Sequence, residues 1–213
     1  KTIHKYGLRE LVNNFSCAEK TTTKKLPRRL WETIFEELLE KSKYAADDAE
    51  TTKKIYSAKG AYAIQISYLE GDYDNITGDY INNLAYDESL LLWHVATELC
   101  FQNTQKEDAA NEEGIPDDDR SLSKFLSDYM MYLLVKEPKM MSAVAGIWKS
   151  RYWDTCAETV KFFGRRGMIK LGSKIACDAI LGIDTEVIPV YIKGETSKSV
   201  LFDACLLAKE LNK

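Results

Sequence analysis

Histidine is scarce in this chain, and its scarcity limits the chemistry that the sequence can support. His4 and His94 are the only two histidines among 213 residues. The zinc-protease pattern needs a second histidine four residues along the same helix, and neither histidine has one. The phosphate-binding patterns GxxxxGK(S/T) and GxGxxG are missing too. The sequence therefore indicates no particular reaction, and we expect no cofactor and no tightly bound metal.

Long hydrophobic runs are also absent. A helix that crosses a bilayer needs about 20 mostly apolar residues, and no window of the sequence approaches this length. The apolar stretch Tyr129–Val135 ends at Lys136 and Glu137, so it is too short to span. It favours instead a helix buried on most sides, with methionines filling gaps in the core. An exposed methionine-lined groove that binds a partner helix is the alternative.

Cysteines are few, odd in number and widely spaced. The five, at positions 17, 100, 156, 177 and 205, form no CxxC pair. This pattern favours reduced, mostly buried thiols in a reducing compartment over a disulfide framework. Cys156 lies near Asp154 and Glu158 in the sequence, and neighbouring carboxylates raise the pKa of a thiol. We therefore expect no nucleophilic role for Cys156.

Charge is nearly balanced overall but uneven along the chain. The net charge of −4 is too small to indicate nucleic acid as a partner. Two clusters of basic residues contain no acidic residue, and such clusters attract anionic membrane surfaces or acidic proteins. A solvated face is the simpler explanation of each cluster. Together with a methionine pair, the clusters form the candidate interaction surface: Lys20, Lys24, Lys25, Arg28, Arg29, Lys161, Arg165, Arg166, Lys170, Lys174, Met140 and Met141.

Apolar residues recur at helical spacing through most of the chain. This periodicity predicts helices within Tyr6–Phe15, Pro27–Tyr44, Asp87–Phe101, Ser121–Lys136, Lys149–Arg165, Ser173–Leu181 and Ser197–Leu211. The sequence therefore predicts a mainly α fold, a single multi-helix domain over residues 1–213. The side chains expected to be largely buried are Trp31, Trp93, Tyr129, Met130, Leu133, Leu134, Trp153 and Phe202.

Two segments depart from the helical pattern. Alternating apolar residues around positions 60–70 suit at most one short strand or hairpin, and short helices suit them equally well. Residues 102–120 hold seven acidic and two basic residues, with Ile115 as the one large apolar side chain. We expect a mobile acidic loop at 103–119 that a protease can cleave, or that neutralises one of the basic clusters.

One pair of side chains is placed for chemistry. His94 and Glu98 stand four residues apart, so they share one face of their predicted helix. With Cys100 they are the candidates for a small hydrolytic or metal-dependent site. A hydrogen bond between the histidine and the glutamate at the edge of the core is the plainer interpretation.

Several motifs resemble a known family when taken together. They are "DESLLLWHVATELCF", "SLSKFLSDYMMYLLVKEPKMMSAVAGI", "RYWDTCAETVKFF" and "TSKSVLFDACLLAKEL". They resemble the plant family known as domain of unknown function 594, from about Tyr86 to Leu211 and weakly from "IHKYGL" onward. The resemblance implies the soluble C-terminal part of a larger protein with several membrane spans. No reaction, cofactor or functional residue carries over with it.

The functional expectation combines the resemblance with the lack of a catalytic pattern. We expect a non-enzymatic protein-interaction or regulatory module at the cytosolic face of a membrane, tethered by spans absent from this chain. The start at Lys1 rather than Met suggests an excised fragment or a processed product. A protein partner is expected, with an anionic membrane surface as a further contact.

Overall fold

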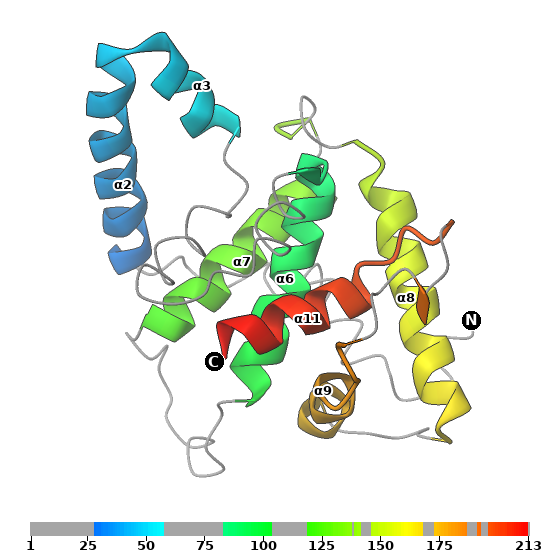
Figure 1. Cartoon of the computed structure of the whole chain (residues 1–213). Coiled ribbons are helices and arrows are strands. Elements are labelled where there is room, and N and C mark those ends of the chain that lie inside the picture. Colours follow the sequence, from blue (N-terminus) through cyan, green and yellow to red (C-terminus); the bar gives the residue numbers. More distant parts are fainter. Residues whose placement is uncertain are drawn as a thin grey trace.

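The computed structural model describes eight stretches of the chain, and within them it is helical. They are residues 28–57, 83–103, 119–137, 139–141, 146–167, 173–186, 191–192 and 196–212. The helices are α2 (Arg28–Asp47), α3 (Ala49–Ser57), α6 (Tyr86–Asn103), α7 (Asp119–Lys136), α8 (Trp148–Arg165), α9 (Ser173–Leu181) and α11 (Leu201–Leu211) (Figure 1). These stretches contain no strand, which confirms the predicted mainly α fold and the single helical domain.

Three of the sequence-based expectations fall outside the described residues. They are the strand or hairpin around positions 60–70, the helix at Tyr6–Phe15 and nearly all of the acidic loop. That loop is bounded by the last residue of α6, Asn103, and the first residue of α7, Asp119. No described helix is both long enough and apolar enough to cross a bilayer.

Helix α6 lies at the centre of the domain and contacts α7, α8, α9 and α11 (Figure 1). Its sequence explains this position, because apolar residues occupy more than one of its sides. Leu91, Leu92, Val95, Ala96 and Leu99 are buried on one broad face, and Leu90 and Trp93 on the other side also pack against the core. A helix with apolar residues on several sides must be surrounded to keep them from water. Each such leucine stabilises the fold by roughly 1.5–3 kcal/mol through burial.

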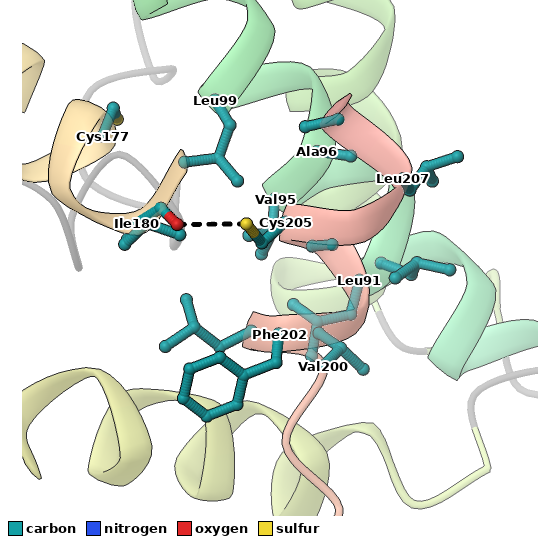
Figure 2. Packing of buried hydrophobic residues seen from close by; sticks show 14 of the residues in the cluster. Leu91, Val95, Ala96, Leu99, Cys177, Ile180, Val200, Phe202, Cys205 and Leu207 are labelled. Carbon is teal, nitrogen blue, oxygen red and sulfur yellow. Dashed lines mark hydrogen bonds between the residues drawn. The ribbon is translucent and has the colours of Figure 1, made fainter. Parts of the chain in front are cut away.

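The C-terminal helix α11 closes the core against α6 and α9. Phe202 and Cys205 point into the space between these helices, together with Ile180 of α9 (Figure 2). The thiol of Cys205 donates to the backbone carbonyl oxygen of Ile180 over 3.0 Å. The ring of Phe202 lies edge-on to that of Phe162 of α8, with the centroids 6.1 Å apart. The core thus draws on α8, α9 and α11, which follow one another in the C-terminal part of the chain, and on the much earlier helix α6.

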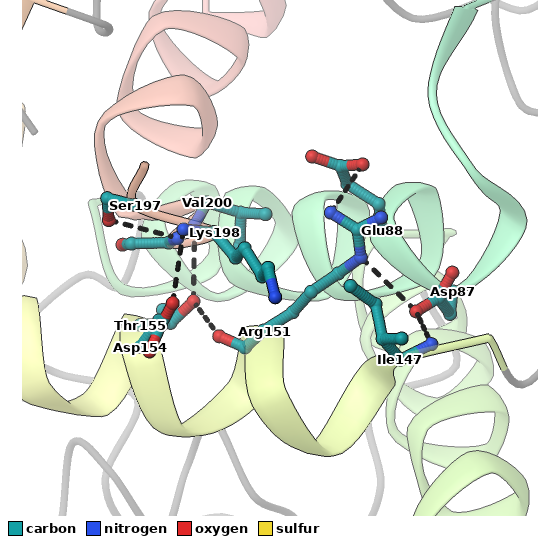
Figure 3. Close-up of polar contacts among 10 residues, drawn as sticks. Asp87, Glu88, Ile147, Arg151, Asp154, Thr155, Ser197, Lys198 and Val200 are labelled. Atoms are coloured by element: carbon teal, nitrogen blue, oxygen red, sulfur yellow. Dashed lines mark hydrogen bonds and ion pairs between the residues drawn. The ribbon is translucent and has the colours of Figure 1, made fainter. Parts of the chain in front are cut away.

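Two hydrogen bonds join α8 to α6 and to α11 (Figure 3). In the first, Asp87 of α6 accepts from the backbone N–H of Ile147, the residue before α8, over 3.0 Å. In the second, Thr155 of α8 accepts from the backbone N–H of Val200, the residue before α11, over 3.1 Å. Two helix starts are therefore held by side chains from other helices.

The turn before α8 is built around the Asp87 carboxylate. Gly146 has a φ of +43°, a left-handed conformation that favours glycine. A Cβ at Gly146 would also lie 2.5 Å from Oδ1 of Asp87. Both the backbone conformation and the close approach therefore require glycine at this position. An aspartate near the start of a helix often caps that helix, whereas the Asp87 carboxylate accepts from the backbone that leads into α8.

Helix boundaries differ from the periodicity at two places. The helix expected to end near Tyr44 continues to Asp47, and α3 follows after Asp48. The Asp48 carboxylate accepts from the backbone N–H groups of Glu50 and Thr51, which caps α3 and lowers the pKa of Asp48. Helix α11 begins at Leu201 rather than Ser197, after Ser199 has accepted a bond from the Leu201 N–H.

The predicted burial is confirmed for some side chains and wrong for two. Leu134 and Phe202 are buried. Trp93, Met130 and Leu133 are half-buried and pack against the core, and Tyr129 is half-buried beside the ring of Trp31. Trp31 and Trp153 are instead 51% and 58% exposed. The periodicity of α2 and α8 was identified correctly, but most of the apolar stripe of α2, including Trp31, is left uncovered, and Trp153 lies outside the buried face of α8.

Candidate functional site

His94 and Glu98 lie on the face of α6 that packs against α7. Nδ1 of His94 is 3.0 Å from Oγ of Ser127 and 3.9 Å from Oδ1 of Asp128. Oε2 of Glu98 is 3.0 Å from Nζ of Lys124, which also pairs with Asp128. We call these five residues the α6–α7 polar cluster. Its members come from two helices and lie together only in the folded chain.

Burial and charge oppose each other at Lys124. Burial by itself lowers the pKa of the Lys124 ammonium, because it penalises the charged form. The nearby carboxylates of Glu98 and Asp128 outweigh this effect, so the pKa of Lys124 is raised overall. Gln102 adds a further bond, since its Nε2 donates to Oε1 of Glu98 over 2.9 Å. The cluster therefore has the features of a buried ion-pair network that joins two helices.

Cys100 lies apart from the two residues with which it was grouped. Its thiol is 3.7 Å from the carbonyl oxygen of Ala208 and accepts from Nδ2 of Asn212 over 3.3 Å. Both partners belong to the C-terminal segment, whereas His94 and Glu98 face α7. Residues two apart on a helix point in nearly opposite directions, which explains the separation. The hypothetical hydrolytic site of His94, Glu98 and Cys100 is therefore not assembled.

The thiols in the described residues are protonated and shielded. Burial raises the pKa of Cys156 and of Cys205 to about 11, and it also raises the pKa of Cys100 and Cys177. For Cys156 the cause is burial and not the neighbouring carboxylates that the sequence suggested. The expected buried, reduced thiols are present at 156, 177 and 205, and Cys17 lies outside the described residues.

Metal ligands do not gather in the described stretches. No group of three or more His, Cys, Asp and Glu side chains within them is arranged to hold a metal ion. The α6–α7 polar cluster does contain a histidine and two carboxylates, but a lysine ammonium lies between the carboxylates. A cation in that position occupies the place that a metal would need.

The first basic cluster is partly neutralised where it can be described. Arg28 pairs with Glu32 over 2.7 Å, and Arg29 pairs with Asp119 over 2.6 Å. Asp119 is the last residue of the predicted acidic loop, so one acid from that stretch does meet a basic cluster. The remaining members of this cluster, Lys20, Lys24 and Lys25, lie outside the described residues.

The second basic cluster is exposed around the C-terminal end of α8. Lys161, Arg165 and Arg166 all lie at the surface, as does Lys174 at the start of α9. The Arg166 guanidinium stacks on the ring of Phe162, 3.8 Å from its centroid. Lys161 lies 3.8 Å from Glu158 one turn earlier. Lys170 falls outside the described residues.

The methionine pair is divided between the surface and the core. Met140 is 71% exposed, whereas Met141 is 9% exposed and joins the hydrophobic core. The run Tyr129–Val135 behaves as the core interpretation predicts, with Met131 and Leu134 buried. Of this pair, Met140 is the one that remains available on the surface.

Two exposed apolar faces were not anticipated. On α2 the exposed side chains are Trp31, Phe35, Leu38 and Leu39, and on α8 the exposed aromatic is Trp153. Of these, Trp31 and Trp153 were predicted to be buried. That prediction was wrong because periodicity identifies an apolar stripe without saying whether another element covers it. On α8 the signal was present in the sequence, since every fourth residue from Lys149 to Arg165 is basic, small or Trp153.

Comparison with known proteins adds no relative. The likeness to the plant family known as domain of unknown function 594 stays a prediction from the four sequence motifs. No family model, no curated protein and no solved structure matches the chain.

Proposed function

We propose that this chain is a non-enzymatic protein-interaction or regulatory module that works at the cytosolic face of a membrane. One observation carries the proposal. His94 and Glu98, the pair best suited to acid–base chemistry, are buried and bonded to α7, while the cations at the end of α8 stand in solvent. Groups used to join helices are poorly placed to act on a substrate, whereas exposed cations can meet an acidic partner.

The membrane setting comes from the resemblance to the plant family. Its members carry several membrane spans before the domain, so the proposal places such spans outside this chain. Burial of the thiols agrees with a reducing compartment but does not require one. The charge of the second basic cluster supports a partner that is acidic, whether protein or lipid.

A pull-down from plant cells in detergent tests the interaction part of the proposal. Detergent removes intact membranes, so recovery then reports a protein partner. The chain is compared with the K161Q/R165Q variant and with K41Q/K43Q, a control of equal charge on α2 where both lysines are exposed. We expect the chain and the K41Q/K43Q control to recover the same protein partner, in a constant ratio of partner to chain. K161Q/R165Q should not recover it.

Two results would count against the proposal. Recovery of no partner at a constant ratio would argue against an interaction module. Equal recovery by K161Q/R165Q would remove the second basic cluster from the interaction and direct attention to Met140, which is tested by Met140→Ser in the same assay.

A further inference from the structure

The outward side of α8 carries an unusual combination of side chains. Lys149, Trp153, Ala157, Lys161 and Arg165 are spaced by four residues and all are exposed. Residues four apart are neighbours on a helix surface, so they follow one another along the helix. We call them the α8 outer face. Figure 1 shows α8 at one side of the domain, with α6 and α11 on its inner side.

Trp153 is the apolar centre of the α8 outer face. Its side chain is 58% exposed, and its ring lies edge-on to that of Tyr152, with the centroids 5.4 Å apart. An indole has an apolar body and one N–H donor, so it favours a boundary between water and an apolar medium. The Trp153 ring therefore lies at the surface of the described residues, where it can contact such a boundary.

Cations lie on both sides of the tryptophan. Lys149 precedes it by one turn, and Lys161 and Arg165 follow it by two and three turns. Lysine and arginine can lay their carbon stems along an apolar surface while the charge contacts lipid phosphates. The chain as a whole carries a net charge of −4, so attraction to anions must come from a local surface such as this one.

The two acidic residues near this face are already engaged. Oδ2 of Asp154 accepts from the backbone N–H of Lys198 over 3.2 Å (Figure 3). The Glu158 side chain is mostly buried and lies 3.8 Å from Nζ of Lys161. Their charges reduce the positive field without reversing it, because Lys149 and Arg165 remain exposed beyond them.

Small residues keep the face flat. Ala157 lies between Trp153 and Lys161, and Gly164 lies beside Lys161 near the end of the helix. A Cβ placed on Gly164 would meet no heavy atom within 4 Å, so the space there is open. Without bulky side chains at these points, the helix can lie along a surface over most of its length.

The exposed apolar face of α2 differs from the α8 outer face in the charge that surrounds its tryptophan. It also presents a tryptophan, Trp31, together with Phe35 and Leu38. Glutamates at 32, 36, 37 and 40 accompany these residues on the same helix and are exposed. Arg28 and Lys41 pair with two of these glutamates, so the α2 face offers an anionic surface less net positive charge than the α8 outer face does.

We propose that the α8 outer face lies on the surface of an anionic phospholipid bilayer, with the Trp153 indole at the level of the headgroups. Lys149, Lys161 and Arg165 then contact lipid phosphates. The inference rests on the proposed function for its membrane setting, while the choice of face and of lipid charge comes from α8. The indole favours a bilayer over an acidic protein, because a headgroup layer offers both apolar and polar contacts.

Vesicle flotation tests the charges. Vesicles of phosphatidylcholine mixed with phosphatidylserine should carry the chain at low salt, and vesicles of phosphatidylcholine alone should not. Each cation near an anionic surface strengthens binding by roughly fivefold, so K149Q/K161Q/R165Q should lose on the order of a hundredfold in affinity. The control K41Q/K43Q/K53Q has the same net charge, with exposed lysines of α2 and α3, and should bind nearly as the parent does.

Quenching by brominated lipids tests the position of the tryptophan. The lipid bromines should quench fluorescence of the parent chain, and Trp153→Phe should lose most of that quenching. Trp31→Phe is the matched control, because Trp31 is similarly exposed but lies on α2. Each variant changes an exposed side chain, and an unchanged melting curve verifies that the fold is intact.

Three outcomes would overturn the inference. They are absence of binding to the charged vesicles, equal losses in the two lysine-and-arginine variants, and quenching that Trp153→Phe leaves unchanged. In the last case another tryptophan lies near the lipids, and the chain binds the bilayer through a surface other than the α8 outer face. If the detergent pull-down succeeds while flotation fails, the inference falls and the proposed function stands.

Discussion

Asp87 in the first turn of α6 accepts a hydrogen bond from the backbone N–H of Ile147, a residue sixty positions later in the chain. The same carboxylate oxygen lies 3.2 Å from Nε of Arg151, whose Nη1 is 2.7 Å from Oε2 of Glu88. The Asp87 side chain is almost wholly buried. The buried Asp87 carboxylate thus fixes the start of α8 and also balances the positive charge of the mostly buried Arg151 guanidinium.

Replacing Asp87 by alanine should destabilise the domain strongly. The change leaves Arg151 with one carboxylate instead of two and removes the acceptor for the Ile147 N–H. Breaking a buried ion pair from one side costs about 3–5 kcal/mol, because the remaining charge stays buried. Chemical denaturation measures the free energy of unfolding. Asp184→Ala, at an exposed carboxylate, is the control, and a loss no larger than in this control would show that Asp87 is dispensable.

Two adjacent leucines of α7 should differ in their contribution to stability. Leu134 is fully buried in the core, and Leu133 is half-buried at its edge. A buried leucine replaced by alanine costs about 2–5 kcal/mol, through lost burial and the cavity left behind. Leu134→Ala should fall in this range and Leu133→Ala clearly below it. Equal shifts in thermal unfolding would mean that both residues contribute equally to the core.

The helical elements could be predicted because the apolar periodicity of each is local. Helices α7, α8 and α9 lie within about a turn of their predicted bounds. Helix α3 was not predicted, since its sequence "AETTKKIYS" has few apolar residues to form a stripe. Its start depends instead on the cap at Asp48, a single side chain that can equally begin a turn.

The partners of the polar residues could not be predicted from local pattern. Spacing correctly placed His94 and Glu98 on one face of a helix, but nothing in the sequence shows that Ser127 and Lys124 face them. The contact of Asp87 with Ile147 is likewise a product of packing between α6 and α8. Exposure of Trp31, Phe35 and Leu38 on α2 follows the same principle, because a stripe is buried only if another element reaches it.

A metal-dependent enzyme would carry bound metal, and elemental analysis tests for it. We expect no zinc in stoichiometric amount, because Lys124 occupies the space between the carboxylates near His94. His94→Ala should instead lower the free energy of unfolding by about 1–3 kcal/mol, since it removes a buried side chain together with its contact to the half-buried hydroxyl of Ser127. Stoichiometric zinc in the parent that disappears in His94→Ala would refute the structural role.

Alkaline pH should destabilise the domain through its buried thiols. Burial raises the pKa of Cys156 and Cys205 from 9.0 to about 11. In the unfolded chain these thiols lose their protons at lower pH, so rising pH stabilises the unfolded state first. Their contribution is therefore fully present below pH 9 and is lost as the pH rises to about 11.

The variant Cys156→Ala/Cys205→Ala isolates this effect. Other groups also titrate in this range, so the informative quantity is the difference between parent and variant in their loss of stability from pH 8 to pH 11. A raised pKa of this size corresponds to about 2–3 kcal/mol for each thiol at the upper end of the range. The variant starts from a lower stability because it leaves cavities, but its stability should fall less steeply with pH. Parallel curves for the two proteins would show that these thiols ionise as readily in the folded chain as in the unfolded one, and that the core is open to solvent at α8 and α11.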